Sequence, residues 1–423
     1  MINKSSFPAI MIALFIIGSF GIISLGYNLS SRPLVFLEYK NPDGLVWSDY
    51  VDFFRASENI IIGKSPYDIA GNRYVTTPIP AVVNILFVPL GFDTARVLFY
   101  LLIPLSLAVG YMLITSLFGF VETDKSLVLM AGLVGLLFGY PFYFLLQREN
   151  IDGWVFLFLC LGFYWLTKPQ KESISGLFFS LAIAFKIYPI LILVPILLGK
   201  KLRLLFWIGL WLTVWGGITL FWFLDFQNAL TVRSQSFFRF DENGSLVATI
   251  SLIFIFFDAL GFTIPSLWIK YSPVIAALLY SLLFCAVAFI DYKMNKTDKY
   301  EIHSYMMYLP FMIALPQIVY HYSFINCLIL IPAVCHLWNN TKNRAQKVTI
   351  LIISIGIAIT QWQAIATYHL TDNILSHAIP GVGLLVIISG IVLFKFLTFY
   401  EQFSRHEFCT LNSIVGLGKR LSR

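Results

Sequence analysis

The sequence predicts an all-α, polytopic membrane protein, and three observations support this fold class. Of its 423 residues, 58% are hydrophobic and only 12% are charged, and the mean hydropathy is +0.80. Soluble domains are about 45–50% apolar and about 25% charged, so lipid must be the main solvent of this chain. The third observation is a series of apolar runs of about 20 residues, the length that crosses a bilayer as a helix. A soluble enzyme, a disordered chain and a coiled coil are excluded.

Seven apolar runs have the length of a membrane span. They occupy residues 8–26, 94–118, 126–146, 204–224, 266–290, 348–368 and 378–399. Shorter candidates lie at 151–167, 302–318 and 323–338, so the chain is expected to have about ten full spans. The first run lacks a small-residue cleavage site and is expected to be an uncleaved span rather than a secretory signal.

Residues 173–199 do not read as a single span. Two apolar stretches of about 12 residues flank a break at Phe185–Pro189, and basic residues lie at both ends of the segment. A single span would place one basic end outside, against the positive-inside tendency. We therefore expect two half-length helices that enter and leave on the cytoplasmic side, because irregular backbone is tolerated at membrane depth where protein covers it.

The positive charge follows from this topology. With the hairpin, most of the 29 Lys and Arg residues fall in loops on one side, which the positive-inside tendency assigns to the cytoplasm together with both termini. The net charge of +7 therefore needs no nucleic-acid partner. Residues 400–423 form a basic tail that is expected to lie on anionic lipid.

Residues 1–399 are expected to form a single transmembrane domain in the cell membrane, with two long polar loops outside. The loops cover residues 27–78 and 225–250, and the first is too long for a simple connection, which indicates a function. Within it, residues 49–62 have helical character, and Gly63 and Pro66 are stop signals. Tyr50, Phe53, Phe54, Ile60 and Ile61 give this interfacial helix an apolar face.

Two carboxylates lie in the first turn of that expected helix. Asp49 and Asp52 are three residues apart and therefore share one side of the helix. They could cap the helix and face water, or one could act as a general base at the edge of a partly desolvated cavity.

Short motifs in the chain resemble those of the polyprenol-phosphate-dependent glycosyltransferases of family 87, which belong to superfamily C. The resemblance runs from Asp49 to about Pro332, and it departs from the family pattern at Tyr50, Phe54 and Gly244. The motifs are Asp49-Tyr50 with Phe53-Phe54, Gly63 to Asp68 with Tyr74 and Pro78, Gln147 with Asn150, Gly176 with Lys186 and Pro189, Asn243 to Leu246, and Pro316 with His321-Tyr322.

This resemblance implies a superfamily C fold and an inverting transfer of a sugar, mannose or arabinofuranose, from a polyprenyl-phosphate carrier to a glycan or glycolipid acceptor at the outer membrane face. Asp49 matches the catalytic aspartate of the family and is assigned as the general base, with Asp52 as the alternative. Mannose is the expected sugar.

The leaving phosphate calls for cations and hydrogen-bond donors on the outer side. We expect these to be His321, Tyr322, Lys186 and Arg233. The alternative roles are an interfacial anchor for His321 beside Tyr322, a structural ion pair for Lys186 and a position in a solvated loop for Arg233. For the sugar or the acceptor we expect Gln147, Asn150, Asn243, Ser245 and Tyr67. Asp152 is expected to cap the next helix.

No metal and no cofactor are expected, and a zinc site in particular is not expected. The chain has no Asp-x-Asp motif, its six histidines include no i, i+4 pair, and its five cysteines are scattered. Two other function classes stay open. One is a transporter or flippase of lipid-linked sugars, which would show two similar halves; the other is an outer-face glycan polymerase or ligase, which would have its largest loop late in the chain.

Overall fold

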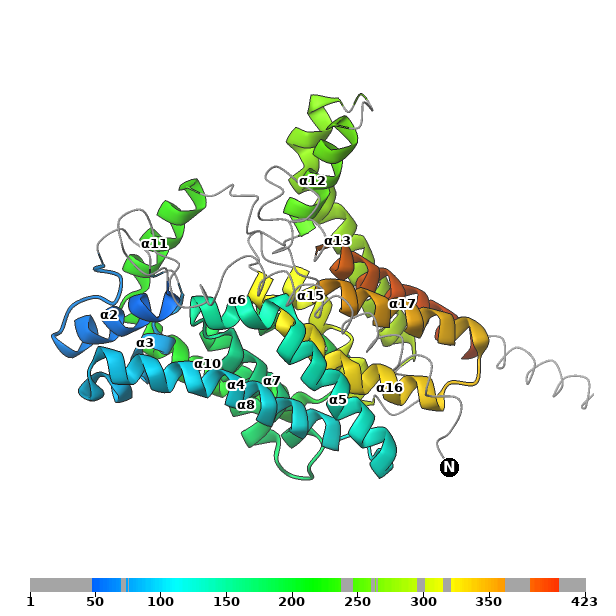
Figure 1. Cartoon of the computed structure of the whole chain (residues 1–423), viewed down its shortest axis with the longest axis horizontal. Helices are drawn as coiled ribbons and strands as arrows, with labels where there is room; N and C mark the ends of the chain where they lie inside the picture. The colour runs from blue at the N-terminus through cyan, green and yellow to red at the C-terminus, as the bar shows by residue number, and fades with distance from the viewer. Residues whose placement is uncertain are drawn as a thin grey trace, which may run out of the picture.

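A computed structural model shows an all-α protein (Figure 1). It describes residues 48–69, 74, 76–236, 246–259, 263, 265–294, 301–314, 321–361 and 381–402, and no strand occurs in these ranges. The expected first span at 8–26 lies outside them. Within the described ranges, five helices are long and apolar enough to cross a membrane: Phe92–Ser116, Leu202–Leu220, Lys270–Met294, Ser323–Asn340 and Gly381–Gln402.

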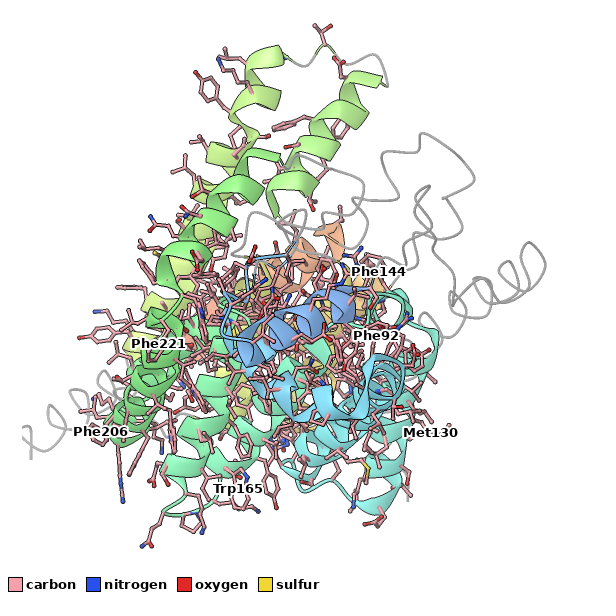
Figure 2. All side chains as sticks on the ribbon, turned by 90° about the vertical axis from the view of Figure 1, so that its left-hand side faces the viewer. Phe92, Met130, Phe144, Trp165, Phe206 and Phe221 are labelled. Carbon is pink, nitrogen blue, oxygen red and sulfur yellow. The ribbon has the colours of Figure 1, made fainter. Side chains whose placement is uncertain are left out.

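Exposed apolar side chains cover the outside of four of these helices, whereas the fifth, Ser323–Asn340, is mostly buried. On α4 (Phe92–Ser116), Val97, Leu101, Leu105 and Met112 form a stripe of side chains that are each more than half exposed. Figure 2 shows further apolar side chains, among them Phe206 and Phe221, at the periphery of the helical body. An apolar surface of this extent would aggregate in water and is suited to contact with lipid.

The helix α2 (Asp49–Ile61) forms where the sequence analysis expected an interfacial helix. The Ser48 hydroxyl caps it by accepting a hydrogen bond from the Tyr50 amide at 3.1 Å. Tyr50 and Phe53 are buried against Phe99 of α4, whereas Ile61, the last residue of the helix, is 53% exposed.

Four helices pack side by side: α4, α7 (Asp152–Leu166), α8 (Glu172–Phe185) and α10 (Leu202–Leu220), the last of which is mostly exposed. The helix α7 packs between α4 and α8, and α10 packs on α8 (Figure 1). Gly162 allows the close approach of α7 and α8, since a Cβ there would lie 2.6 Å from the ring of Phe179. This packing fixes the N-terminal end of α7, which carries Asp152.

The segment 173–199 breaks where the sequence predicted. The helix α8 ends at Phe185, and the chain continues through η3 (Tyr188–Ile192) into α9 (Leu193–Leu198). Pro189 lies at the start of η3, where its missing N–H costs no hydrogen bond. Lys186 at the break contacts Asp152 at the start of α7, while Gly199 after α9 lies against Tyr305.

Two predicted spans are broken instead of continuous. Residues 126–146 were expected as one span, but they fold as α5 (Glu122–Phe138) and α6 (Tyr140–Arg148). The break falls at Gly139, which has extended backbone and whose Cβ would lie 2.8 Å from the Gln361 side chain; Pro141 then starts α6. Residues 302–318 likewise divide into α14 (Ile302–Met306) and α15 (Leu309–Ala314), with Pro310 at the start of the second helix.

The outer loop expected at 225–250 is helical over much of its length. The helix α11 (Phe223–Ser236) occupies its first half, and α12 (Leu246–Ala259) begins at its end. Apolar residues in 246–259 are too few for a span but enough for a helix that packs on α13 (Ser266–Met294). In Figure 1 this helical pair extends away from the body.

The C-terminal part of the described chain consists of packed helices. Residues 321–340 form η4 (His321–Ile329) and α16 (Leu330–Asn340), which lead to α17 (Arg344–Thr360). The helix at 381–402 contributes Lys395 to a buried ion pair with Asp291 of α13, at 2.7 Å. Short helices α3 (Ile79–Asn84) and η2 (Ile85–Leu90) complete the fold beside α2.

Candidate active site

Asp49 lies at the first position of α2, and its carboxylate is held from both sides. One side-chain oxygen accepts from Arg148 Nη2 at 2.6 Å, and the other accepts from the Asn150 amide. The Asp49 and Arg148 side chains are 18% and 15% exposed, so this ion pair is largely but not fully removed from solvent. A carboxylate offers about four acceptor positions, and two are used here.

The turn after α6 sets this geometry. Glu149 adopts a left-handed conformation with φ of 50°, which turns its side chain away from those of its two neighbours. Its carboxylate accepts two hydrogen bonds from Arg96 Nε of α4, at 2.7 and 2.9 Å, and one from the Ser48 hydroxyl. The residue that caps α2 is therefore tied to the same turn that holds Asp49.

A second acidic residue lies directly behind Asn150. The amide of Asp152 donates to Asn150 Oδ1 at 3.0 Å, and the Asp152 side chain is completely buried. Its carboxylate accepts from the Tyr188 hydroxyl at 2.6 Å and from the Ser323 hydroxyl at 3.4 Å, and Lys186 Nζ lies 3.5 Å away. The sequence analysis expected Asp152 to cap α7, but its side chain does not. The side chain of Asn150 accepts the hydrogen bond from the backbone N–H instead.

This network brings together four segments that are far apart in the sequence. Asp49 comes from the first loop, Arg148 to Asp152 from the connection of α6 and α7, Lys186 from the break after α8, and Ser323 from η4. We call the set of Asp49, Arg148, Asn150, Asp152, Lys186, Tyr188 and Ser323 the Asp49 network. Two of the expected site residues, Asn150 and Lys186, lie in it together with Asp49.

Other expected residues occupy separate places or are not described. Tyr67 is buried beside Phe226 of α11, and its hydroxyl donates to the Thr76 carbonyl at 2.8 Å. Asp52 is half-buried in the first turn of α2. His321 and Tyr322 directly precede Ser323, Arg233 lies in α11 and Gln147 in α6, but the description does not extend to these four side chains. Asn243 and Ser245 lie outside the described residues.

The aromatic wall beside Asp49 is neutral. Burial raises the pKa of the Tyr50 phenol to about 12, so it stays protonated at physiological pH. Phe53, Phe99, Ile151, Trp154 and Phe185 line a narrow apolar cavity on the same side of α2. The only formal charges of the Asp49 network are those of two aspartates, Arg148 and Lys186, which balance.

The sequence analysis missed three residues of the network. Arg148, Tyr188 and Ser323 were not among the expected site residues, because none of them carried a signal as a single residue. The contact of Asp152 with Lys186 could have been predicted. An acidic residue within an apolar run such as 151–167 needs a charged partner, and Lys186 is a cation within another apolar segment.

The chain matches known proteins over this part of the structure. The sequence pattern described as Glycosyltransferase family 87 matches residues 77–316, more than half of the chain. The matched range includes Arg148 to Asp152 and Lys186 but neither Asp49 nor Ser323, and the predicted family is confirmed.

A relative is also found among mannosyltransferases. GPI mannosyltransferase 1 from Dictyostelium discoideum is 31% identical over 172 residues, which cover 39% of this chain and 37% of that protein. The chain thus matches little more than a third of that relative's length. Together with the family match, this places a sugar-transferring enzyme on the helical membrane scaffold, and the chain belongs to glycosyltransferase family 87.

Proposed function

We propose that this enzyme transfers a single mannose, with inversion, from a polyprenyl-phosphate carrier to a glycan or glycolipid acceptor at the outer face of the cell membrane, on a superfamily C fold. The observation that carries the proposal is the position of Asp49, whose carboxylate is oriented by Arg148 and Asn150 at the edge of a mostly buried polar network. The mannosyltransferase relative supports the sugar class.

In the proposed reaction, the acceptor hydroxyl attacks the anomeric carbon while the bond to the lipid phosphate breaks. Asp49 takes the proton of that hydroxyl, and the phosphate leaves with the electron pair of the broken bond. Because Arg148 and Asn150 use two acceptor positions of Asp49, further lone pairs remain for the acceptor. Asp52 is the alternative base on the same helix.

Lys186 is the proposed cation for the departing phosphate. It lies 3.5 Å from Asp152, and its side chain is 19% exposed, so a ligand can reach it from solvent. His321, Tyr322 and Arg233 are the further candidates for the phosphate. Arg148 joins them, because it already faces the base.

The remaining candidates would contact the sugar or the acceptor. Asn150 is next to the proposed base, and Gln147 lies one turn before it on α6. Asn243, Ser245 and Tyr67 belong to the outer loops. The reaction as proposed needs no metal, since a monophosphate leaving group carries less charge than a diphosphate.

The decisive variant is Asp49→Asn, assayed in membranes supplied with polyprenyl-phosphate mannose. Loss of a general base costs about 10²–10⁴-fold in rate, so we expect a drop of that size in kcat with little change in the folded fraction. Glu58→Gln is the matched control: it makes the same chemical change on the exposed side of α2. Transfer by Asp49→Asn at the parental rate would overturn the base assignment.

A topology experiment tests the outer placement of the site. Single cysteines at Ser65 and Ser173 should react with impermeant thiol reagents from opposite sides of sealed vesicles, in a background without the native cysteines. Ser65 lies near the end of α2, and Ser173 is in the first turn of α8. Equal labelling of both from outside would contradict the expected orientation.

A further inference from the structure

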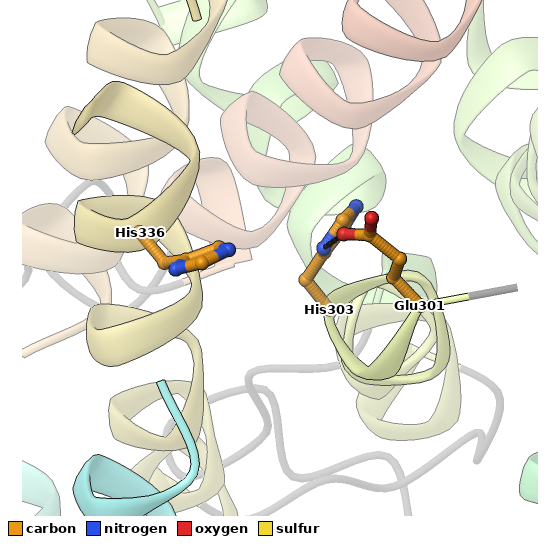
Figure 3. Close-up of side chains that lie close together, drawn as sticks. All are labelled: Glu301, His303 and His336. Atoms are coloured by element: carbon orange, nitrogen blue, oxygen red, sulfur yellow. Dashed lines mark ion pairs between the residues drawn. The ribbon is translucent and has the colours of Figure 1, made fainter. Parts of the chain in front are cut away.

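A cluster of metal-ligating side chains lies away from the Asp49 network. Glu301, His303 and His336 each present one ligand atom, and these three atoms lie within 4.8 Å of one another (Figure 3). Among the described residues, no other group of three acidic, His or Cys side chains meets this criterion. Ser323 contacts Asp152, whereas His336 lies 13 residues later, about 20 Å along η4 and α16.

We propose that these three residues bind a divalent transition-metal ion such as Zn²⁺ and clip α14 to α16. Two imidazoles and one carboxylate are a ligand set that suits zinc and its neighbours in the first row, and not Mg²⁺ or Ca²⁺, which prefer oxygen ligands. Three protein ligands leave a coordination position for water. The proposal does not depend on the proposed sugar transfer.

The distances are close to those of a metal site. His303 Nδ1 lies 3.1 Å from Glu301 Oε2, and the rings of His303 and His336 have centroids 6.3 Å apart. Ligand atoms around a tetrahedral zinc ion are separated by roughly 3.4 Å, given metal–ligand bonds of about 2.0–2.1 Å. The separations of up to 4.8 Å therefore have to shorten on metal binding, and Glu301, whose side chain is 62% exposed, has room to rotate.

The surrounding residues hold the His336 imidazole in place. Phe118 and Phe120, from the connection between α4 and α5, pack on the His336 ring with centroids 5.1 and 6.4 Å away. The Asn340 amide donates to the His336 carbonyl at 2.9 Å and lies 3.1 Å from the ring Nε2. Because that amide is already bonded to the backbone, a metal ion can take the ring lone pair without leaving Asn340 unpaired.

Sequence spacing could not reveal this site. His303 and His336 are 33 residues apart and lie on different helices, so neither an i, i+4 pair nor a short ligand motif occurs. In the expected topology, this end of α16 faces the cytoplasm, opposite to the Asp49 network. A metal there would stabilise the scaffold from the side that the reaction does not use.

The test is direct binding of Zn²⁺ and Co²⁺ to the full-length protein in detergent, purified without a histidine tag and stripped with chelator. We expect one equivalent of Zn²⁺ to bind and raise the thermal unfolding midpoint, and Co²⁺ to give visible ligand-field absorption of a low-coordinate site. His303→Gln and His336→Gln should each weaken binding by more than about tenfold. His406→Gln, in the C-terminal tail, is the matched control.

The exposed ligand keeps the test independent of folding. Glu301→Gln leaves the packing intact because its side chain is 62% exposed, and it should still weaken Zn²⁺ binding. No stoichiometric binding by the parent would overturn the proposal. Binding that is equally tight in the parent, His303→Gln, His336→Gln and Glu301→Gln would overturn it too.

Discussion

Two aspartate–lysine pairs occur among the described residues, and they are built differently. Asp291 and Lys395 meet at 2.7 Å, their side chains are 2% and 4% exposed, and Ser304 and Tyr308 complete their hydrogen bonds. Asp152 and Lys186 are 3.5 Å apart. There the aspartate is fully buried, but the lysine is 19% exposed.

The difference indicates two roles for the same pair of residue types. The Asp291–Lys395 pair is enclosed, and it joins α13 to the helix at 381–402. The Asp152 carboxylate has its closest hydrogen bond from Tyr188 at 2.6 Å, which leaves Lys186 at longer range and open to solvent on one side. A lysine held in this way can serve a ligand, whereas Lys395 can serve only the fold.

The largest expected effect on stability is that of Lys395→Met. It leaves Asp291 buried without its cation, and breaking such a pair costs about 3–5 kcal/mol. The measurement is the free energy of unfolding in detergent, with the exposed Lys342→Met as control. Equal stability of the two variants would show that the enclosed pair does not hold the helices together.

Lys186→Met should reduce stability less than Lys395→Met does, but it should reduce kcat strongly. Asp152 keeps its hydrogen bonds from Tyr188 and Ser323, so the loss of stability should be smaller than for Lys395→Met. Removal of a cation that stabilises developing phosphate charge should lower kcat by about 10²–10³-fold. Lys186→Arg should recover part of this activity. If Lys186→Met destabilised the protein as much as Lys395→Met and slowed catalysis only in proportion, the two pairs would be equivalent.

The smallest expected effect is on the rate of sugar transfer, and it distinguishes the N-terminal caps of two helices. Ser48 caps α2 and Asn343 caps α17, each through a hydrogen bond from a backbone amide two residues later. Replacement of either residue by Ala should cost about 1 kcal/mol of stability. Only Ser48→Ala should also slow sugar transfer, by several-fold, because Ser48 bonds to Glu149 in the turn that orients Asp49. Equal turnover in both variants would argue against that coupling.

Much of the fold was predictable because local signals agree with it. The helix α2 has a cap, an apolar face and a glycine stop, and the break after α8 coincides with Lys186 and Pro189. The break at Gly139 was not predicted, because the apolar run 126–146 was long enough for one span and outweighed the local signals of Gly139 and Pro141; a Cβ at Gly139 would lie 2.3 Å from the Gly135 carbonyl oxygen. The helix α12 was missed since it is too short for a membrane span.

The residues of the candidate site likewise divide into those that local sequence signals predict and those that they do not. Asp49, Asn150 and Lys186 stand out by charge or motif, and the structure places them in one network. Arg148 and Tyr188 acquire their roles only through contacts with residues 36 or more positions away, which no local pattern encodes. The same is true of the pair of His303 and His336.

The left-handed residue Glu149 makes chain length a constraint of its own. Arg148 and Asn150 reach the same carboxylate because the single residue between them reverses direction and anchors to Arg96. Side chains in this turn can be exchanged one at a time with graded losses. Insertion or deletion of one residue there would break the link from Ser48 through Glu149 to Arg96 and separate the base from both its partners together, so the length of this turn matters more than any single side chain in it.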